Sequence, residues 1–213
     1  MSMLLNIIPS LLTGCAQTLS LFAETIAVSL ISALLLACLQ YQGNAIFKRL
    51  LGVFIYIERG TPLMLQLMFI YFGLPFLGIT LDRNASILTA FILNYTAYLT
   101  EIFRAGIMAV DIGQFEAARA LGMSNGHMFI RIILPQAARC SIPPVTNEIL
   151  NLIKDTSLIT VLGASELLKA GRTAVNTYAT ALPFVYVGIL YLIMSAAASY
   201  IMKKVENAYI WQN

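Results

Sequence analysis

The chain has 213 residues, of which 59% are hydrophobic and only 11% are charged, and its formal net charge at pH 7 is +3. Soluble domains carry about 25% charged residues, so this composition excludes an ordinary soluble globule and predicts an integral membrane protein. Uncharged runs of about 20 residues are long enough to cross the hydrocarbon core as helices. We therefore expect an all-α fold.

Charge-poor stretches predict about five membrane-spanning helices in a single domain that covers residues 1–213. In chain order, the expected spans are 16–39, 51–74, 85–103, 134–166 and 181–202. In the second of these, Pro62 follows Gly60 and Thr61. Proline lacks an amide donor and clashes with the preceding turn, so this span should be kinked or unwound at that point.

The fourth expected span carries more polar residues than the others. Pro143 and Pro144 are adjacent, and Lys154 and Asp155 follow in the same stretch. Two prolines remove two backbone donors, and an ion pair is costly inside a bilayer. We expect a broken or re-entrant helix here.

The distribution of lysine and arginine predicts the orientation of the chain. If the N-terminus is outside, the inner segments hold Lys48, Arg49, Arg104, Arg119, Arg131, Arg139, Lys203 and Lys204, and the outer loops hold Arg83, Lys169 and Arg172. The positive-inside rule therefore places the N-terminus outside and the C-terminus in the cytoplasm. The opening residues MSMLLNIIPSLLTG lack the basic region of a signal peptide, so we expect no cleavage.

Metal binding and catalysis are not expected. Cys15, Cys38 and Cys140 lie within or beside predicted spans, His127 is the single histidine, and no C-x-x-C pair or Cys/His cluster exists. An intramembrane enzyme would need a nucleophile with a base or a group of metal ligands. We predict neither catalytic residues nor a metal site.

A charged, helix-forming stretch, QFEAARALGMSNGHMFIRIILPQAAR at 114–139, interrupts the apolar chain. Asp111 and Gly113 favour a turn and a helix start, the alanine-rich run that follows favours a helix, and Gly122 favours its end. A helix of about two to three turns is marginal on its own in water. It should therefore pack against a partner surface, unless it is only a connector between spans.

Four motifs resemble one family. The run EAA at 116–118, Gly122 four residues later and ILP at 133–135 resemble the EAA loop of permease subunits of bacterial ATP-binding cassette importers. The runs ERGTPLMLQLMFIYFGLP, AYLTEIFRAGI and IKDTSLITVLGASEL resemble, in order and spacing, the polar amino-acid permeases of that group. The resemblance extends from the first span to the fifth.

This resemblance implies that the loop 108–128 forms a coupling helix that docks in a groove of a cytoplasmic ATPase subunit. The implied contact or turn residues are Glu116, Ala117, Ala118 and Gly122, with Arg119 near the rim. The chain itself has no G-x-x-x-x-G-K-[ST] motif to hold nucleotide phosphates. We therefore expect a transport subunit that is not an enzyme and has no cofactor of its own, with ATP and magnesium bound by the partner ATPase.

The resemblance also implies the function and the partners. The chain would form the substrate pathway of an ATP-driven amino-acid importer in the bacterial inner membrane, with a second permease that is identical or similar. Two cytoplasmic ATPase subunits, an external substrate-binding protein, an amino acid and membrane lipid complete the expected partners, without nucleic acid. The alternative is an ion-coupled secondary amino-acid transporter, although five spans without an internal repeat fit the inverted-repeat plan poorly.

The fourth span carries the expected substrate residues. Glu148, Asn151 and Asp155 are spaced i, i+3 and i+7, which places them on one helical face, with Asn147 beside them. Ionisable groups inside a bilayer are costly, so a polar stripe on an apolar span should face a cavity. Oxygen acceptors on this stripe suit the ammonium group of an amino acid.

Donors for the substrate carboxylate are expected from Thr156, Ser157 or backbone amides that are free where the helix breaks. The alternative for this region is that Lys154 and Asp155 have a structural role and pair with other charges of the chain. In the second span, Thr61 and Gln66 are expected to reach the same cavity.

Three other charged groups have structural interpretations. Glu58 and Arg59 favour an ion pair between packed helices, and Glu101 with Arg104, three residues later, favours a local salt bridge. Glu24 departs from the small or apolar residues that the resembled family usually has in the first span. It either inclines the pathway toward cationic substrates or lies close enough to the outer surface to stay solvated.

Overall fold

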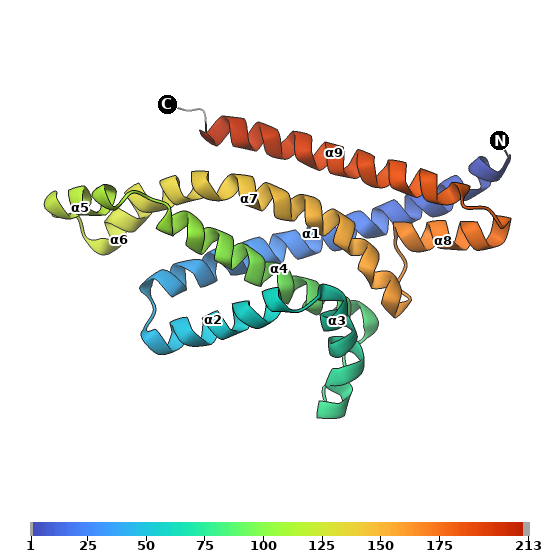
Figure 1. Cartoon of the computed structure of the whole chain (residues 1–213), viewed down its shortest axis with the longest axis horizontal. Helices are drawn as coiled ribbons and strands as arrows, with labels where there is room; N and C mark the ends of the chain where they lie inside the picture. The colour runs from blue at the N-terminus through green and yellow to red at the C-terminus, as the bar shows by residue number, and fades with distance from the viewer. Residues whose placement is uncertain (1, 211–213) are drawn as a thin grey trace.

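The computed structural model describes residues 2–210, and every regular element in this part of the chain is a helix (Figure 1). The all-α prediction is therefore confirmed. In chain order the elements are α1 (Ser2–Gln42), α2 (Ala45–Gly60), α3 (Leu63–Met68), η1 (Phe69–Gly73), η2 (Leu74–Leu77), α4 (Arg83–Met108), α5 (Ile112–Ala120), α6 (Asn125–Met128), η3 (Phe129–Ile133), α7 (Leu134–Asp155), η4 (Thr156–Leu162), α8 (Leu167–Tyr178) and α9 (Leu182–Ile210).

Within the described residues, three helices are long and apolar enough to cross a membrane alone: Met3–Tyr41, Arg83–Met108 and Leu182–Tyr209. The segments Ala45–Gly60 and Leu63–Leu77 are long and apolar enough to cross a membrane only when they are taken together, and they are bent by 104° relative to each other. The bend follows Gly60 and coincides with the predicted kink at Pro62. α7 has 22 residues, enough to cross a bilayer, but it carries the polar residues of the predicted stripe.

The long helices lie side by side in a bundle with two distinct ends. Figure 1 shows α5 and α6 at one end, and α8 with the N-terminus at the opposite end. α1 and α7 run between the two ends, and α4 packs against both of them.

α1 approaches α4 closely because one face of α1 is built from small residues. Thr18, Thr25, Ser29, Ala33 and Ala37 are all at most 1% exposed and recur every four or seven residues. The Ser29 hydroxyl donates a hydrogen bond to the Ile92 carbonyl oxygen at 3.3 Å. Small residues let helix backbones pack tightly in a membrane, where the hydrophobic effect between helices is absent.

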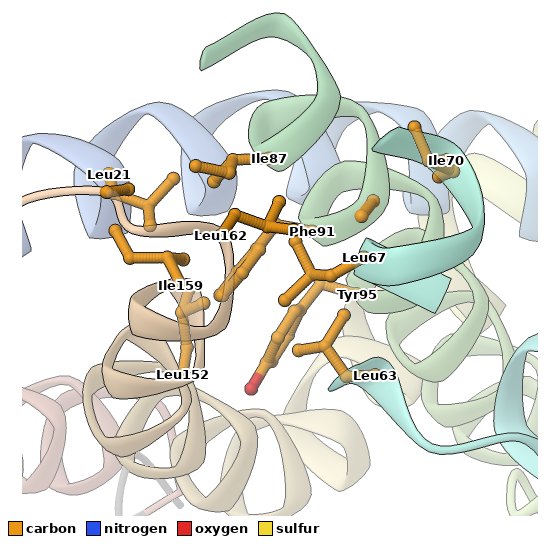
Figure 2. Close-up of a cluster of buried hydrophobic side chains, with 12 residues drawn as sticks. Leu21, Leu63, Leu67, Ile70, Ile87, Phe91, Tyr95, Leu152, Ile159 and Leu162 are labelled. Atoms are coloured by element: carbon orange, nitrogen blue, oxygen red, sulfur yellow. The ribbon is translucent and has the colours of Figure 1, made fainter. Parts of the chain in front are cut away.

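The main apolar core surrounds the N-terminal half of α4. Figure 2 shows Phe91 and Tyr95 of α4 among Leu63 and Leu67 of α3, Leu152 of α7, and Ile159 and Leu162 of η4. This cluster fixes the bent α3 and the distorted η4 against the same helix. The polar residues near these two breaks are thereby brought together.

The structure corrects the expectation that Pro143 and Pro144 break the fourth span. α7 runs through both prolines without interruption, and the chain changes to the tighter η4 only at Thr156. η4 ends at Gly163, which has a φ of 68°, in the region that favours glycine. Neighbouring helices hold α7 on both sides of the prolines, since Ser141 and Val145 are buried, and such packing lets membrane helices retain proline.

Candidate functional site: a polar cavity and a coupling segment

A cavity of about 330 Å³ lies where the α2–α3 break, α4 and α7 meet. Its lining residues are Thr61, Pro62, Leu63, Asn94, Tyr95, Tyr98, Glu148, Asn151, Asp155 and Leu158. We call this the polar cavity. One of its three walls is the α2–α3 break, and polar side chains of α4 and α7 form much of the other two.

α7 contributes the polar stripe that its sequence spacing predicts. Glu148, Asn151 and Asp155 all line the polar cavity, whereas Asn147 is exposed and lies outside the lining set. Asp155 accepts a hydrogen bond from the Tyr95 hydroxyl at 2.7 Å. Lys154 donates to the Asn151 side-chain oxygen at 3.1 Å. Among the described residues, the ion pairs are Arg59–Glu101 and Arg104–Glu101, so the expected alternative, in which Lys154 and Asp155 pair with other charges, is not what the structure shows.

The break between α2 and α3 is stabilised by side-chain amides. Gln66 donates from its amide nitrogen to the Glu58 carbonyl oxygen and to the Thr61 hydroxyl, both at 2.8 Å. Asn94 of α4 donates to the same Glu58 carbonyl at 3.2 Å and to the Gln66 side-chain oxygen at 3.0 Å. Gln66 thus bonds to the backbone at the break and does not line the polar cavity, whereas Thr61 lines it as expected.

Charged residues on α2 and α4 form a group beside the polar cavity. Glu101 accepts two hydrogen bonds from Arg104, at 2.6 and 2.7 Å, which confirms the predicted local salt bridge. Arg59 pairs with Glu101 at 3.8 Å rather than with its neighbour Glu58, which corrects the expected Glu58–Arg59 pair. Adjacent residues on a helix point about 100° apart, so Arg59 reaches α4 while Glu58 does not share that direction.

Glu24 is separated from the α7 stripe. It is exposed and accepts a hydrogen bond from the Ser20 hydroxyl at 2.7 Å. It lines a different cavity of about 610 Å³, together with Gln17, Asp82 and Arg83. The structure therefore does not bring Glu24 into the polar cavity.

Sequence reasoning did not find Tyr95 and Tyr98, which provide the aromatic wall of the polar cavity. Tyr95 is 1% exposed, and its ring belongs to the apolar core while its hydroxyl reaches Asp155. Both tyrosines lie within the motif-bearing stretch NYTAYLTEIF of α4. The available signal was the three-residue spacing of Tyr95, Tyr98 and Glu101, together with Asn94 four residues before Tyr98.

The charged central stretch forms α5, which packs on its own chain through the buried Ala118 and the half-buried Phe115. Ala118 is 1% exposed and lies in a cluster with Met128, Phe129 and Ile133. Glu116, Ala117 and Arg119 are exposed. Gly122 has a φ of 72°, so the predicted stop is formed by a residue that tolerates a left-handed turn.

The exposed side of α5 is partly apolar. Ile112 and Leu121 at its two ends are 72% and 79% exposed, and Met108 just before it is 71% exposed. Large apolar side chains are seldom so exposed in a contiguous group on a polar loop unless a partner covers them. One face of α5 therefore packs on its own chain, and the opposite face is available to contact a partner.

A family model for the binding-protein-dependent transport system inner membrane component matches residues 25–210. The chain belongs to this family. The match includes the whole polar cavity and the whole of α5 to α6, so the resemblance seen in the motifs is confirmed over nearly the full length.

Individual members of the family are similar along almost the entire chain. The arginine transport system permease protein ArtQ of Bacillus subtilis is 36% identical over 202 residues, covering 94% of this chain and 92% of that protein. The glutamine transport system permease protein GlnP of Escherichia coli K12 is 35% identical over 203 residues, covering 94% and 93%. A crystal structure of an amino acid ABC transporter with histidines superimposes with a TM-score of 0.89, at 29% identity, over 96% of both chains.

Proposed function

We propose that this chain is the membrane-spanning permease subunit of an ATP-driven amino-acid importer. The observation that carries the proposal is the polar cavity, because its walls bring acceptor side chains of α7 against the broken α2–α3 segment at the centre of a family-typical bundle. Broken helices with polar linings are the usual form of substrate sites in membrane transporters.

Within the polar cavity, Glu148, Asn151 and Asp155 are proposed to accept hydrogen bonds from the ammonium group and any polar side chain of the substrate. Thr61 contributes from the opposite wall. Two carboxylates in one cavity favour substrates that carry more positive charge, such as arginine, lysine or histidine. Asn147 and Glu24 lie outside this cavity, so a role for either one would require a rearranged state.

α5 is proposed to be the coupling helix for a cytoplasmic ATPase subunit. Glu116, Ala117 and Arg119 are on its exposed surface, whereas Ala118 anchors it and Gly122 forms the turn after it. The proposed complex contains a second permease, two ATPase subunits that bind ATP and magnesium, and an external substrate-binding protein. In this arrangement the N-terminus is outside and α5 is cytoplasmic, in a bacterial inner membrane.

The similarity to permeases of arginine and glutamine transport systems favours the importer over the ion-coupled alternative. The two functions differ in what drives uptake. An importer needs ATP and its ATPase subunit, whereas an ion-coupled transporter needs only an ion gradient.

Uptake by the complete transporter in proteoliposomes tests this proposal. We expect ATP-dependent uptake of at least one of arginine, lysine, histidine and glutamine. Glu116→Lys should abolish coupled uptake because it reverses a charge on the exposed face of α5. Glu148→Gln should raise the KM about tenfold or more, since a charge-assisted hydrogen bond contributes about 1.5–3 kcal/mol.

The matched control is Glu206→Lys, a charge reversal in the last turns of α9, outside both the polar cavity and α5. It should retain wild-type uptake. Uptake that needs no ATPase subunit and follows an ion gradient would overturn the proposal in favour of a secondary transporter.

A further inference from the structure

The polar cavity has an unequal supply of hydrogen-bonding groups. Its described lining contains the carboxylates Glu148 and Asp155 and the side-chain oxygen of Asn151, but neither lysine nor arginine. These groups suit an ammonium group. An amino acid also has a carboxylate, which needs donors and preferably a cation when it leaves water.

The hydroxyl groups at and beside the polar cavity already donate hydrogen bonds within the chain. The Thr156 hydroxyl donates to the Ile153 carbonyl oxygen at 2.7 Å, and the Ser157 hydroxyl donates to the Lys154 carbonyl oxygen at 2.7 Å. The Tyr95 hydroxyl donates to Asp155, and the Thr61 hydroxyl donates to the Ile57 carbonyl oxygen at 2.9 Å. A substrate carboxylate in the polar cavity therefore needs a donor or a cation other than these hydroxyls.

Arg59 lies beside the polar cavity without lining it. It is in the last turn of α2, two residues before the lining residue Thr61. Its guanidinium carbon lies 5.3 Å from the ring centroid of Tyr98, which is also a lining residue. The Arg59 side chain is 42% exposed, so its long, flexible stem leaves the guanidinium free to change direction.

The ion pair that holds Arg59 is weak compared with its neighbour. Arg59 is 3.8 Å from Glu101, whereas Arg104 makes two hydrogen bonds with Glu101 at 2.6 and 2.7 Å. Glu101 would therefore remain neutralised if Arg59 moved away. Arg59 is the replaceable partner in this group and Arg104 is the fixed one.

We infer that Arg59 binds the α-carboxylate of the substrate, exchanging its contact with Glu101 for one with the bound amino acid. The inference rests on the proposed function, and it assigns the second charged half of the substrate to a residue on α2. A guanidinium suits this task because its planar donors match a carboxylate in a two-pronged geometry. Bound substrate would then connect α7, through its ammonium group, to the hinge end of α2.

Lys154 is the competing cation. It is exposed on α7 and donates to Asn151, which lines the polar cavity. It belongs to the same helix as the acceptor stripe, so a carboxylate bound there would leave the α2 side of the cavity without a charged contact. The two cations can be separated by mutation.

The experiment compares two probes on the purified permease–ATPase complex without binding protein, by equilibrium binding. One probe is whichever of arginine, lysine, histidine and glutamine the wild type takes up fastest, and the other is the amine that remains when its α-carboxylate is removed. Arg59→Gln should weaken binding of the amino acid tenfold or more and leave binding of the amine unchanged. Arg59→Lys should restore part of the loss because it keeps the charge but not the planar fork.

Arg49→Gln is the matched control, since Arg49 is an exposed arginine on the same helix. It lines neither the polar cavity nor the neighbouring cavity of about 550 Å³ that Arg59, Glu101 and Arg104 line. This variant should bind both probes as the wild type does. Equal weakening of both probes by Arg59→Gln, or loss of amino-acid binding only in Lys154→Gln, would overturn the inference while wild-type uptake still supports the importer. A wild-type complex that takes up none of the four amino acids with ATP would instead overturn the proposed function, and the inference with it.

Discussion

Tyr95 joins the apolar core to the polar cavity through a single oxygen atom. Its ring is enclosed by Phe91, Leu67 and their neighbours, and its hydroxyl donates to Asp155 at 2.7 Å (Figure 2). Burying a carboxylate is costly unless it is hydrogen-bonded. The tyrosine therefore makes it possible for Asp155 to occupy a half-buried place at the end of α7.

Removing this hydroxyl should cost stability as well as function. We expect Tyr95→Phe to lower the free energy of unfolding by about 1–3 kcal/mol, because Asp155 keeps its burial and loses its donor. A lower melting temperature of the complex in nanodiscs would measure the effect. Tyr178→Phe, which removes the hydroxyl of a tyrosine that is 37% exposed, should leave the melting temperature unchanged.

Glu166 organises the end of the bundle farthest from α5. It is 1% exposed, and its carboxylate accepts hydrogen bonds from the backbone amides of Leu168 and Lys169, both at 2.6 Å, and from the Tyr191 hydroxyl at 2.8 Å. Glu166 thus caps the start of α8 and also links α8 to α9. The adjacent Leu167 amide donates to Thr18 of α1 at 3.3 Å.

We expect Glu166→Ala to destabilise the fold by about 2–4 kcal/mol, since it removes a helix N-cap and leaves the Tyr191 hydroxyl without its acceptor. Asp82→Ala removes a comparable N-cap, at the start of α4, from an exposed position with one amide partner at 2.9 Å. That variant should cost only about 1 kcal/mol. Equal losses of melting temperature in the two variants would contradict a special role for Glu166.

At the residue scale, the sequence predicts those members of the site that share one helix. Glu148, Asn151 and Asp155 follow from helical spacing alone, because their common face is fixed by 3.6 residues per turn. Tyr95 and Arg59 belong to other helices. Their direction depends on how α4 and α2 are rotated against α7, which no local pattern specifies.

At the scale of elements, the crossing of α4 and α7 depends on the absence of one side chain. A Cβ atom at Gly106 would lie 2.8 Å from the Ala137 carbonyl oxygen, and nearer still to the Ser141 hydroxyl oxygen. Real Cβ atoms do not approach backbone oxygen so closely, so any larger residue must push the two helices apart. Glycine is thus required for the contact rather than for a turn.

Gly106→Ala should destabilise the protein by about 1–3 kcal/mol through overpacking. Gly188→Ala is the matched control in α9, where a Cβ atom would meet no other atom within 4 Å. That change should be neutral or stabilise the helix by up to about 1 kcal/mol, because alanine is the better helix former. Thermal unfolding of both variants in the same nanodiscs checks the difference.

Elements with strong local signals were predicted well, and elements that depend on packing were not. Pro62 beside Gly60 indicated the bend of α2 and α3, and the alanine-rich run indicated α5. The prediction that Pro143 and Pro144 break α7 was wrong. A proline weakens a helix locally, but packing against neighbouring helices decides whether the helix breaks. Ala118 was expected to contact a partner, but it is buried within the chain.

At the scale of the whole molecule, the expected orientation can be tested directly. The positive-inside rule places the N-terminus outside and the C-terminus in the cytoplasm. We expect green fluorescent protein to fluoresce when it is fused to the C-terminus and to remain dark when a Sec-exported fusion joins it to the N-terminus. The reverse pattern would place α5 outside the cell, where no ATPase subunit could reach it.

The polar cavity and the cavity that Glu24 lines are separate, and the composition of the chain does not predict this separation. Hydropathy locates the long apolar helices, but α7 is less apolar than the others because it carries the polar stripe of Glu148, Asn151 and Asp155. The sequence therefore predicts that polar groups must be sheltered. The three-dimensional arrangement of the helices decides which polar groups share a cavity. It also places Glu24 and Glu148 in different cavities.

The close contact between Gly106 of α4 and Ser141 of α7 is a point about which α7 could rotate relative to α4. From Leu134, where α7 begins, to Ser141 at the contact is about 10 Å of helix, and from Ser141 to Asp155, where α7 ends, is about 21 Å. A rigid helix that rocks about Ser141 would move its far end about twice as far as its near end. On this geometry α7 acts as an unequal lever, and a small displacement of α5 becomes a larger one at the carboxylate that Tyr95 holds.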